Sequence, residues 1–417
     1  MINGNREFEL LKKIGFIRTS GSAEELKAAQ ILLDEIKEIG LEGKLDAFPV
    51  RNDIVEEAVL EVVEPYQKRY RVTGFTCSGN LEETVAEFKY VEDLNDIDLH
   101  DVKGKVILMN TRPGIKNFEK IVKSGALAFV TFQGTIKDSL EESDLEERKL
   151  RESVKKYGCL PGFNILARDA QEMVLKKAGN VKVKLIQTEK EWTSHNVMVS
   201  ILGSEYPDEE INFCGHYDSV PFSTGVYDNG AGSVIIMEIL RHFKENPPKR
   251  TMNFLWFGSE EVGLEGSKYY IQKYADTLDR SILTINVDVA GCVLGRDLAM
   301  VTSDESLCHY IEHLAKEINF SMNVKQQVYS SDSTPFANAG VPAVSFARFG
   351  TEGGAFIHCR YDLIDWLSSD SLAHTTEFVL VFADRIDKAK INPIVRKMPE
   401  NMVKDIHQYL DIKTEEK

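Results

Sequence analysis

The stretch Ile211-Asn-Phe-Cys-Gly-His-Tyr-Asp decides the fold, because an apolar strand is followed directly by an imidazole and a carboxylate, those of His216 and Asp218. Three later apolar runs also have the length of buried strands: Met252-Asn-Phe-Leu-Trp-Phe, Ile282-Leu-Thr-Ile-Asn-Val and Pro342-Ala-Val-Ser-Phe. Helical patterns occur at 230–245 and 305–318. Strands that alternate with helices predict an α/β fold with a mainly parallel sheet covered on both faces.

The ends of these strands carry the residues that we expect at the functional site. His216 and Asp218 follow the first strand, Glu260 and Glu261 follow the second, and Asp288 closes the third. Open α/β sheets bind ligands outside the carboxyl ends of their strands. The active site is therefore expected at this edge of the sheet.

Five candidate metal ligands share a chemistry and a position: each is an imidazole or a carboxylate at a predicted strand end or in a loop. They are His216, Asp228, Glu261, Asp288 and His358. Nitrogen and oxygen donors suit Zn²⁺, Mn²⁺ or Co²⁺ better than a cysteine-rich structural zinc site does. Converging carboxylates would repel one another without a cation between them. A single loop histidine is more often structural, so the prediction depends on the five occurring together.

The adjacent pair Glu260-Glu261 has two interpretations. Neighbouring residues cannot both point the same way, so one could bind metal while the other stays free as a general base for a metal-activated water. Alternatively, the pair is an acidic helix N-terminus favoured by the helix dipole. The pair alone leaves both open.

Five ordered motifs together resemble the binuclear zinc aminopeptidases, metallopeptidase family 28, over 1–46 and 192–385. The motifs are Gly215-His-Tyr-Asp-Ser-Val-Pro, Tyr227-Asp-Asn-Gly-Ala-Gly-Ser, Gly258-Ser-Glu-Glu-Val-Gly-Leu-Glu-Gly-Ser-Lys-Tyr-Tyr, Asn286-Val-Asp and Ile357-His-Cys-Arg-Tyr-Asp. The resemblance implies the zinc-exopeptidase fold, a mainly parallel mixed sheet flanked by helices. It also implies removal of N-terminal residues from peptides.

The intervening segment 47–190 resembles the protease-associated domain, a smaller β-rich α+β unit that is often inserted in such enzymes. Val102-Lys-Gly-Lys-Val-Ile-Leu-Met and Lys123-Ser-Gly-Ala-Leu-Ala-Phe-Val carry this weaker likeness. We therefore predict a peptidase domain formed by 1–46 and 191–390, an insert at 47–190, and a C-terminal tail at 391–417.

For the metal ligands, the family resemblance implies two divalent ions per chain. His216 and Asp288 would bind one ion, Glu261 and His358 would bind the other, and Asp228 would bridge both. Zn²⁺ is the first expectation for the metal, with Co²⁺ and Mn²⁺ as alternatives.

For the reaction, the resemblance implies that Glu260 is the general base and that Asp218 orients a histidine ligand. The segment Ser331-Asp-Ser-Thr-Pro-Phe resembles the family's substrate-side segment, and its Asp332 is as readily structural as functional. Tyr361 or Tyr329 would donate to the developing oxyanion, with packing as the alternative role for both.

Three positions depart from the family's usual pattern. Tyr227 stands where an aspartate usually precedes the bridging aspartate, Ser333 where a histidine often follows the Ser-Asp pair, and Cys359 where a threonine often follows the last histidine ligand. The bridge is kept, so these departures bear on its surroundings and on substrate selectivity. Strand alternation puts Cys214 on the same face as His216, where we expect it to serve as a packing residue.

Composition limits the partners and the compartment. The 417 residues include 50 Lys and Arg against 66 Asp and Glu, a net charge of −16 that disfavours nucleic acid and anionic membranes as partners. Arg6 and Glu7 interrupt the segment where a signal peptide would be apolar, and no run approaches the length of a membrane span. We expect a cytoplasmic enzyme whose partner is a peptide substrate, and we leave homo-oligomer formation open.

Other functions remain as alternatives at this point. A related binuclear carboxypeptidase or amidohydrolase also carries His-x-Asp and Glu-Glu, and a glutaminyl cyclase would bind one metal per chain. A catalytically silent peptidase-like receptor or scaffold would lack some ligands, whereas all five ligands and the base are present here.

Overall fold

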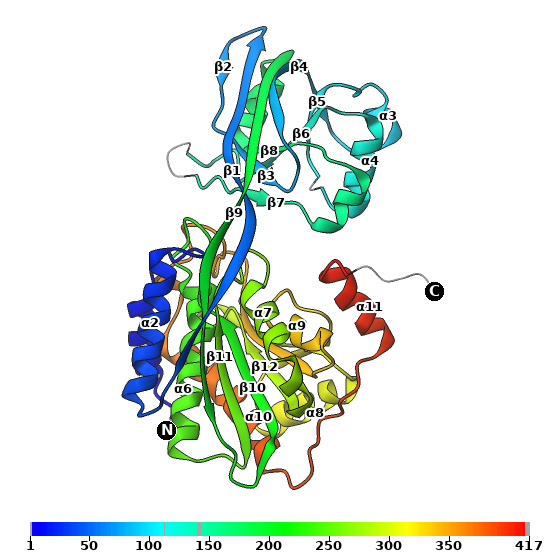
Figure 1. Cartoon of the computed structure of the whole chain (residues 1–417). Coiled ribbons are helices and arrows are strands. Elements are labelled where there is room, and N and C mark those ends of the chain that lie inside the picture. Colours follow the sequence, from blue (N-terminus) through cyan, green and yellow to red (C-terminus); the bar gives the residue numbers. More distant parts are fainter. Residues whose placement is uncertain (1, 112, 140–142, 413–417) are drawn as a thin grey trace. The chain divides into compact units, whose positions relative to one another are not determined.

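The computed structural model of the chain describes residues 2–111, 113–139 and 143–412 (Figure 1). It divides the chain into two compact units, a larger one formed by Met1–Val50 with Trp192–Lys417 and a smaller one formed by Arg51–Glu191. The smaller unit and the predicted insert, 47–190, span nearly the same residues. No helix of the described residues has the length and apolar character to cross a membrane.

The larger unit is built from strands and helices in alternation. Its strands are β10 (Tyr206–His216), β11 (Arg250–Phe257), β12 (Ser281–Val287), β13 (Gly295–Thr302), β14 (Met322–Gln326), β15 (Ala343–Gly350) and part of β9 (Asn180–Ile201). Its helices are α1 (Gly4–Ile14), α2 (Ala23–Glu38), α6 (Ala231–Glu245), α7 (Glu265–Lys273), α8 (Glu305–Glu317), α9 (Ser333–Asn338), α10 (Ser369–Lys388) and α11 (Glu400–Tyr409). The short turns η2 (Val226–Gly230), η3 (Ala275–Arg280) and η4 (Ile364–Trp366) complete it.

These strands form a mixed, mainly parallel sheet in the order β14-β13-β15-β12-β10-β11-β9. The pairs β10–β11, β10–β12, β12–β15 and β13–β14 are parallel, whereas β13–β15 and β9–β11 are antiparallel. The predicted fold class is therefore confirmed. Because β10, β11 and β12 are parallel neighbours, their carboxyl ends meet at one edge of the sheet.

Side-chain alternation along β10 places core residues on both faces of the sheet. Ile211 and Phe213 join the main core, in which the rings of Phe213 and Phe254 stack with their centroids 5.0 Å apart. Cys214 faces the other way and packs with Phe257 and residues of α7 and α9. Helices therefore cover both faces, with α6 and α10 on one and α7 and α9 on the other (Figure 1).

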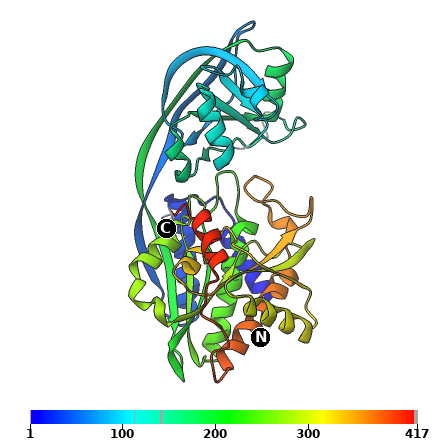
Figure 2. The ribbon, with the colours of Figure 1, turned by 90° about the vertical axis from the view of Figure 1, so that its right-hand side faces the viewer.

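The segment 391–417, predicted as a tail, contains helix α11. Met402 and Ile406 of this helix are buried against α9 and the start of β15. In Figure 2, α11 is the red helix near the middle of the view. Its last residue, Tyr409, reaches the cavity described below.

The smaller unit has its own strands, helices and core. Besides the first part of β9, its strands are β1 (Lys44–Glu64, which begins in the larger unit), β2 (Lys68–Arg69), β3 (Thr73–Thr76), β4 (Leu81–Val91), β5 (Val106–Met109), β6 (Ala128–Gln133), β7 (Arg148–Lys149) and β8 (Gly162–Leu166). The helices are α3 (Asp96–Leu99), α4 (Ile115–Ser124), α5 (Ala167–Leu175) and the turn η1 (Glu152–Tyr157). Two apolar clusters lie around β5, β6 and β8.

A buried acid in α1 makes the stability of the larger unit depend on pH. Burial raises the pKa of Glu7 from its ordinary 4.5 to about 8, against a hydrogen bond from the Thr376 hydroxyl that lowers it. The folded state therefore holds the Glu7 proton more tightly than the unfolded chain does. The stabilisation that the neutral Glu7 carboxyl contributes is fully present below pH 4.5 and is lost as pH rises through about 8.

We therefore expect Glu7→Gln to increase the free energy of unfolding relative to the native chain by ~1 to 3 kcal/mol more at pH 9 than at pH 5. Denaturant titrations at several pH values measure this difference. Glu9→Gln, on the exposed side of the same helix, is the matched control and should change stability equally at both pH values. An equal response of both variants to pH would contradict the assignment to Glu7.

Candidate active site

All the predicted ligands lie at one edge of the sheet in the larger unit. His216 is the last residue of β10, Asp228 lies in η2, Glu260 and Glu261 follow β11, Asp288 follows β12, and His358 lies between β15 and η4. The parallel strands bring four of these positions together because their carboxyl ends are neighbours. Asp228 and His358 come from loops at the same edge.

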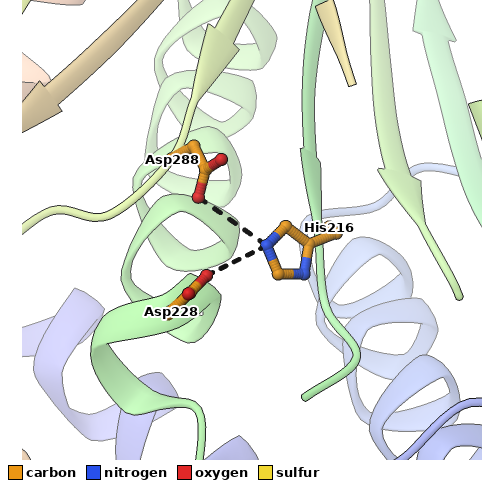
Figure 3. A group of neighbouring side chains, drawn as sticks. All are labelled: His216, Asp228 and Asp288. Carbon is orange, nitrogen blue, oxygen red and sulfur yellow. Dashed lines mark ion pairs between the residues drawn. The ribbon is translucent and has the colours of Figure 1, made fainter. Parts of the chain in front are cut away.

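His216 lies between two carboxylates (Figure 3). Its Nε2 atom is 3.2 Å from Oδ1 of Asp228 and 3.6 Å from Oδ1 of Asp288. All three residues are buried, and each offers one ligand atom within 4.8 Å of the other two. This group is one candidate metal site.

His358 forms a second group with the same aspartate. Its Nε2 atom is 3.1 Å from Oδ2 of Asp228 and 3.2 Å from Oε2 of Glu261. The two oxygens of Asp228 thus face different histidines, so that this carboxylate is shared by two ligand groups. His216, Glu260 and Glu261 form a third, overlapping group.

The electrostatics of the site show how strongly the groups interact. Burial by itself would lower the pKa of His358, but the Asp228 and Glu261 carboxylates raise it to about 11. Burial likewise opposes a charge on His216, yet its carboxylate neighbours raise its pKa well above the ordinary value. Burial raises the pKa of Glu261 to about 7, with a further contribution from Asp228. Positive charge is therefore strongly favoured at this site.

The donor set fits divalent metal ions of the kind predicted. Oε1 of Glu261 and Oδ1 of Asp288 are buried and make no hydrogen bond within the described part of the chain. A buried carboxylate oxygen without a donor is costly unless a cation satisfies it. Two imidazoles and several carboxylates match the ligands that Zn²⁺ accepts in catalytic sites.

Asp218 connects the histidine to the glutamate pair. Its carboxylate accepts hydrogen bonds from the backbone N–H groups of Glu260, at 3.0 Å, and Glu261, at 3.2 Å. Its Oδ1 atom is also 3.4 Å from Nδ1 of His216. Asp218 therefore restrains the loop that carries both glutamates as well as facing the imidazole.

Asp362 holds the loop that carries Asp228, a role that the sequence analysis missed. Its carboxylate accepts hydrogen bonds from the backbone N–H groups of Tyr227, at 2.8 Å, and Asp228, at 3.2 Å. Ser223 Oγ adds a third at 3.1 Å. Asp362 ends the last of the quoted motifs, which was the signal available for it in the sequence.

Arg18 supports the same region from the N-terminal part of the chain. Its guanidinium is fully buried and donates to the backbone carbonyls of Phe16, Tyr217, Thr224 and Gly225. Burial lowers its pKa to about 10, against the nearby carboxylates, so it remains charged at neutral pH. The loop between β10 and η2 is therefore held on a buried cation.

The site opens into a cavity of about 630 Å³. Besides the five ligand positions and Glu260, the wall is made of aromatic, apolar and a few polar residues. These are Tyr227, Gly263, Leu264, Val289, Arg296, Tyr329, Ser330, Phe349, Gly350, Ala355, Ile357 and Tyr409.

The three predicted substrate residues lie in different places. Tyr329 lines the cavity. Tyr361 is half exposed and not part of the wall, with its ring 6.1 Å from that of Phe356. Asp332 is completely buried behind the wall, where burial raises its pKa to about 7.

Two of the three departures from the family pattern, Tyr227 and Ser333, have local explanations. The Tyr227 hydroxyl donates to the Arg348 carbonyl and accepts from the Gly350 N–H, which ties η2 to the end of β15. Ser333 is buried and hydrogen-bonds Ser345 at 2.8 Å, away from the cavity wall.

Comparison with known families agrees with this geometry, since residues 196–383 match the sequence model of "Peptidase family M28". Those residues are therefore similar to an M28 peptidase domain. The match contains His216, Asp228, Glu261, Asp288 and His358.

Two curated relatives match most of the chain. Aminopeptidase YwaD of Bacillus subtilis (strain 168) is 26% identical over 415 residues, which cover 95% of this chain and 87% of the relative. Carboxypeptidase Q of Homo sapiens is 26% identical over 371 residues, covering 82% and 76% respectively. Both kinds of exopeptidase are therefore relatives of this chain.

Solved structures share the fold of this chain. BSAP, a zinc aminopeptidase from Bacillus subtilis, superimposes with a TM-score of 0.74 at 23% identity over 96% of this chain and 99% of its own. An aminopeptidase from Aneurinibacillus sp. strain AM-1 gives a TM-score of 0.70 at 21% identity over 96% and 97%.

Proposed function

We propose that this chain is an M28 peptidase and acts as an aminopeptidase with two divalent metal ions, with Zn²⁺ as the first expectation. The observation that carries the proposal is the position of Asp228, whose two oxygens face His216 and His358 separately. Asp288 completes the first ligand group and Glu261 the second. The ions would lower the pKa of a water and polarise the scissile carbonyl.

Glu260 is proposed as the general base. Its side chain lines the cavity, and Oε2 lies 4.0 Å from Nε2 of His216. Burial, with a contribution from Glu261, raises the pKa of Glu260 well above its ordinary value, so the carboxylate is a better proton acceptor than an exposed one. Glu260 takes a proton from the attacking water and gives it to the leaving amine, while Asp218 holds its backbone in place.

Tyr329 is proposed as a donor to the oxyanion that develops on the substrate. It lines the cavity, and burial, with nearby carboxylates such as Asp288, raises the pKa of its phenol. The hydroxyl therefore keeps its proton at neutral pH and can donate a hydrogen bond. Tyr361 is outside the wall and is a weaker candidate for this role.

The direction of hydrolysis has two candidates. The aminopeptidase reading is supported by YwaD, which matches 95% of this chain, and by the fold shared with BSAP. A carboxypeptidase is the second candidate, because carboxypeptidase Q is 26% identical over 82% of the chain.

A peptide panel tests the direction. The zinc-loaded protein is given one tripeptide with a free amine, the same peptide N-acetylated, and the same peptide with a C-terminal amide, and the products are identified by mass spectrometry. We expect release of the N-terminal residue from the free-amine and amidated peptides, and cleavage of the acetylated one at least 100-fold slower. Release of the C-terminal residue, or equal cleavage after acetylation, would favour the carboxypeptidase.

A further inference from the structure

Arg296 stands out in the cavity wall because it is the single lysine or arginine among the described residues that line it. It belongs to β13, and its side chain is exposed. Within residues 2–111, 113–139 and 143–412, it forms no hydrogen bond or ion pair through its guanidinium. An arginine with five unused donors in a substrate cavity is available to an anion.

The register of β13 and β15 relates Arg296 to an aromatic part of the cavity wall. Arg296 is directly opposite Phe349 in this antiparallel pair, so both side chains lie on the same face. The ring of Phe349 is 5.9 Å from that of Tyr329, and all three side chains line the cavity that contains Asp288. Arg296 and this aromatic pair therefore line the same cavity as the metal ligands.

The next pair in the register, Asp297 and Arg348, contains an arginine with a structural role. Asp297 is opposite Arg348, and their ion pair has an N–O distance of 2.5 Å. Arg348 also donates to the carbonyls of Cys292 and Val293. The guanidinium of Arg348 therefore has its partners within the fold. Arg296 lies on the other face of the sheet and has no such partner among the described residues.

The charges of the cavity favour an anionic substrate group at this position. The wall carries four carboxylates: Asp228, Glu260, Glu261 and Asp288. Two divalent ions, which the proposed function requires, would balance those four negative charges. Arg296 would then leave the holoenzyme cavity with an excess positive charge.

We infer that Arg296 binds a carboxylate of the substrate and that the enzyme prefers short peptides with such a group near the scissile bond. The inference rests on the proposed function for the position of that bond. The planar guanidinium fits a carboxylate through two parallel hydrogen bonds. A cavity of about 630 Å³ has the size that encloses small ligands, which suits a peptide of two or three residues.

Two substrate carboxylates share this chemistry: the C-terminal carboxylate of a dipeptide and the side chain of an acidic N-terminal residue. Binding is measured by calorimetry with the zinc-loaded Glu260→Gln protein, which binds peptides without turning them over. The probes are leucyl-leucine, leucyl-leucinamide and glutamyl-leucinamide. The comparison protein carries Arg296→Gln in addition.

We expect the added Arg296→Gln substitution to weaken binding of at least one carboxylate probe by about 10-fold or more, as loss of a hydrogen bond to a charged group does. Leucyl-leucinamide, which has no carboxylate, should change less than twofold. A loss confined to leucyl-leucine identifies the C-terminal carboxylate, and a loss confined to glutamyl-leucinamide identifies the acidic side chain. Arg296→Lys should retain part of the affinity, and the preference should fall as salt is added.

Lys325→Gln is the matched control, because Lys325 is an exposed cation on β14 of the same sheet and does not line the cavity.

Two results would overturn the inference. One is that every probe binds equally well to the Glu260→Gln protein and to the protein that also carries Arg296→Gln. The other is that neither carboxylate probe binds to the protein that keeps Arg296. Since binding is read without turnover, carboxylate-dependent binding with no peptide hydrolysis by the native chain would reject the proposed function alone. Hydrolysis with no carboxylate preference would reject the inference alone.

Discussion

Glu260→Gln is expected to lower kcat for peptide hydrolysis by about 10²- to 10⁴-fold while two metal ions remain bound per chain. The glutamine side chain has the same shape and still lines the cavity but cannot take a proton from water. The backbone at this position should stay in place, because Asp218 accepts a hydrogen bond from its N–H and not from its side chain. Steady-state kinetics and metal analysis by mass spectrometry measure the two effects.

The neighbouring glutamate provides the contrast for this prediction. Glu261 Oε2 lies 3.2 Å from the His358 imidazole, so Glu261→Gln should reduce the bound metal as well as the rate. Glu265→Gln, at the start of α7, carries the same change of charge on a side chain paired with Lys268 and should leave both properties within about twofold. Near-native turnover by Glu260→Gln with both metals bound would remove Glu260 as the base. Loss of metal from that variant would instead assign it as a ligand, as its place beside His216 and Glu261 allows.

Asp228→Asn is expected to lower the metal content from two ions to one or fewer per chain and to reduce peptide hydrolysis by about 10³-fold or more. The amide keeps the size of the side chain but offers one oxygen and no negative charge between His216 and His358. The loss of metal should exceed the loss caused by substituting a ligand that belongs to one group only, because the His216 group and the His358 group both contain Asp228. Metal analysis after dialysis, together with kinetics in added Zn²⁺, measures the effect.

Asp365→Asn is the control for Asp228→Asn, since Asp365 is exposed in η4 and belongs to none of the ligand groups. It should keep two ions and near-native activity. Two tightly bound ions in Asp228→Asn would contradict the shared carboxylate. Full recovery of activity in excess Zn²⁺ would show that Asp228 serves affinity and not the reaction.

The sequence predicted the sheet and the grouping of the candidate ligands at its edge because both leave local signals. Buried strands are short apolar runs, and β10, β11 and β12 each end where a histidine or an acidic residue begins. The helical patterns at 230–245 and 305–318 were also local signals, and they correspond to α6 and α8. Parallel neighbours then bring the strand ends together without further information.

The residues that hold the site in shape left no periodic signal, although Asp362 ends one of the quoted motifs. Asp362 contacts the backbone of Asp228 from 134 positions away, and Arg18 reaches Gly225 across 207 positions. Neither contact follows a helical or strand period, and a lone aspartate or arginine in a loop is ordinarily a surface residue. Their burial and partners became visible only when the loops were placed in three dimensions.

The residues around the substrate also separate into those that the sequence indicated and those that required the tertiary structure. By itself the sequence determined the α/β fold, the strand ends and the set of imidazole and carboxylate groups, because periodicity and residue chemistry are local properties. Only the tertiary structure decided that Asp332 is buried behind the wall, that Tyr361 is outside it, and that Tyr409 and Arg296 line the cavity. The physical reason is that a cavity is formed by the side chains of several elements, and which of them face it depends on strand register and helix packing that no single segment specifies.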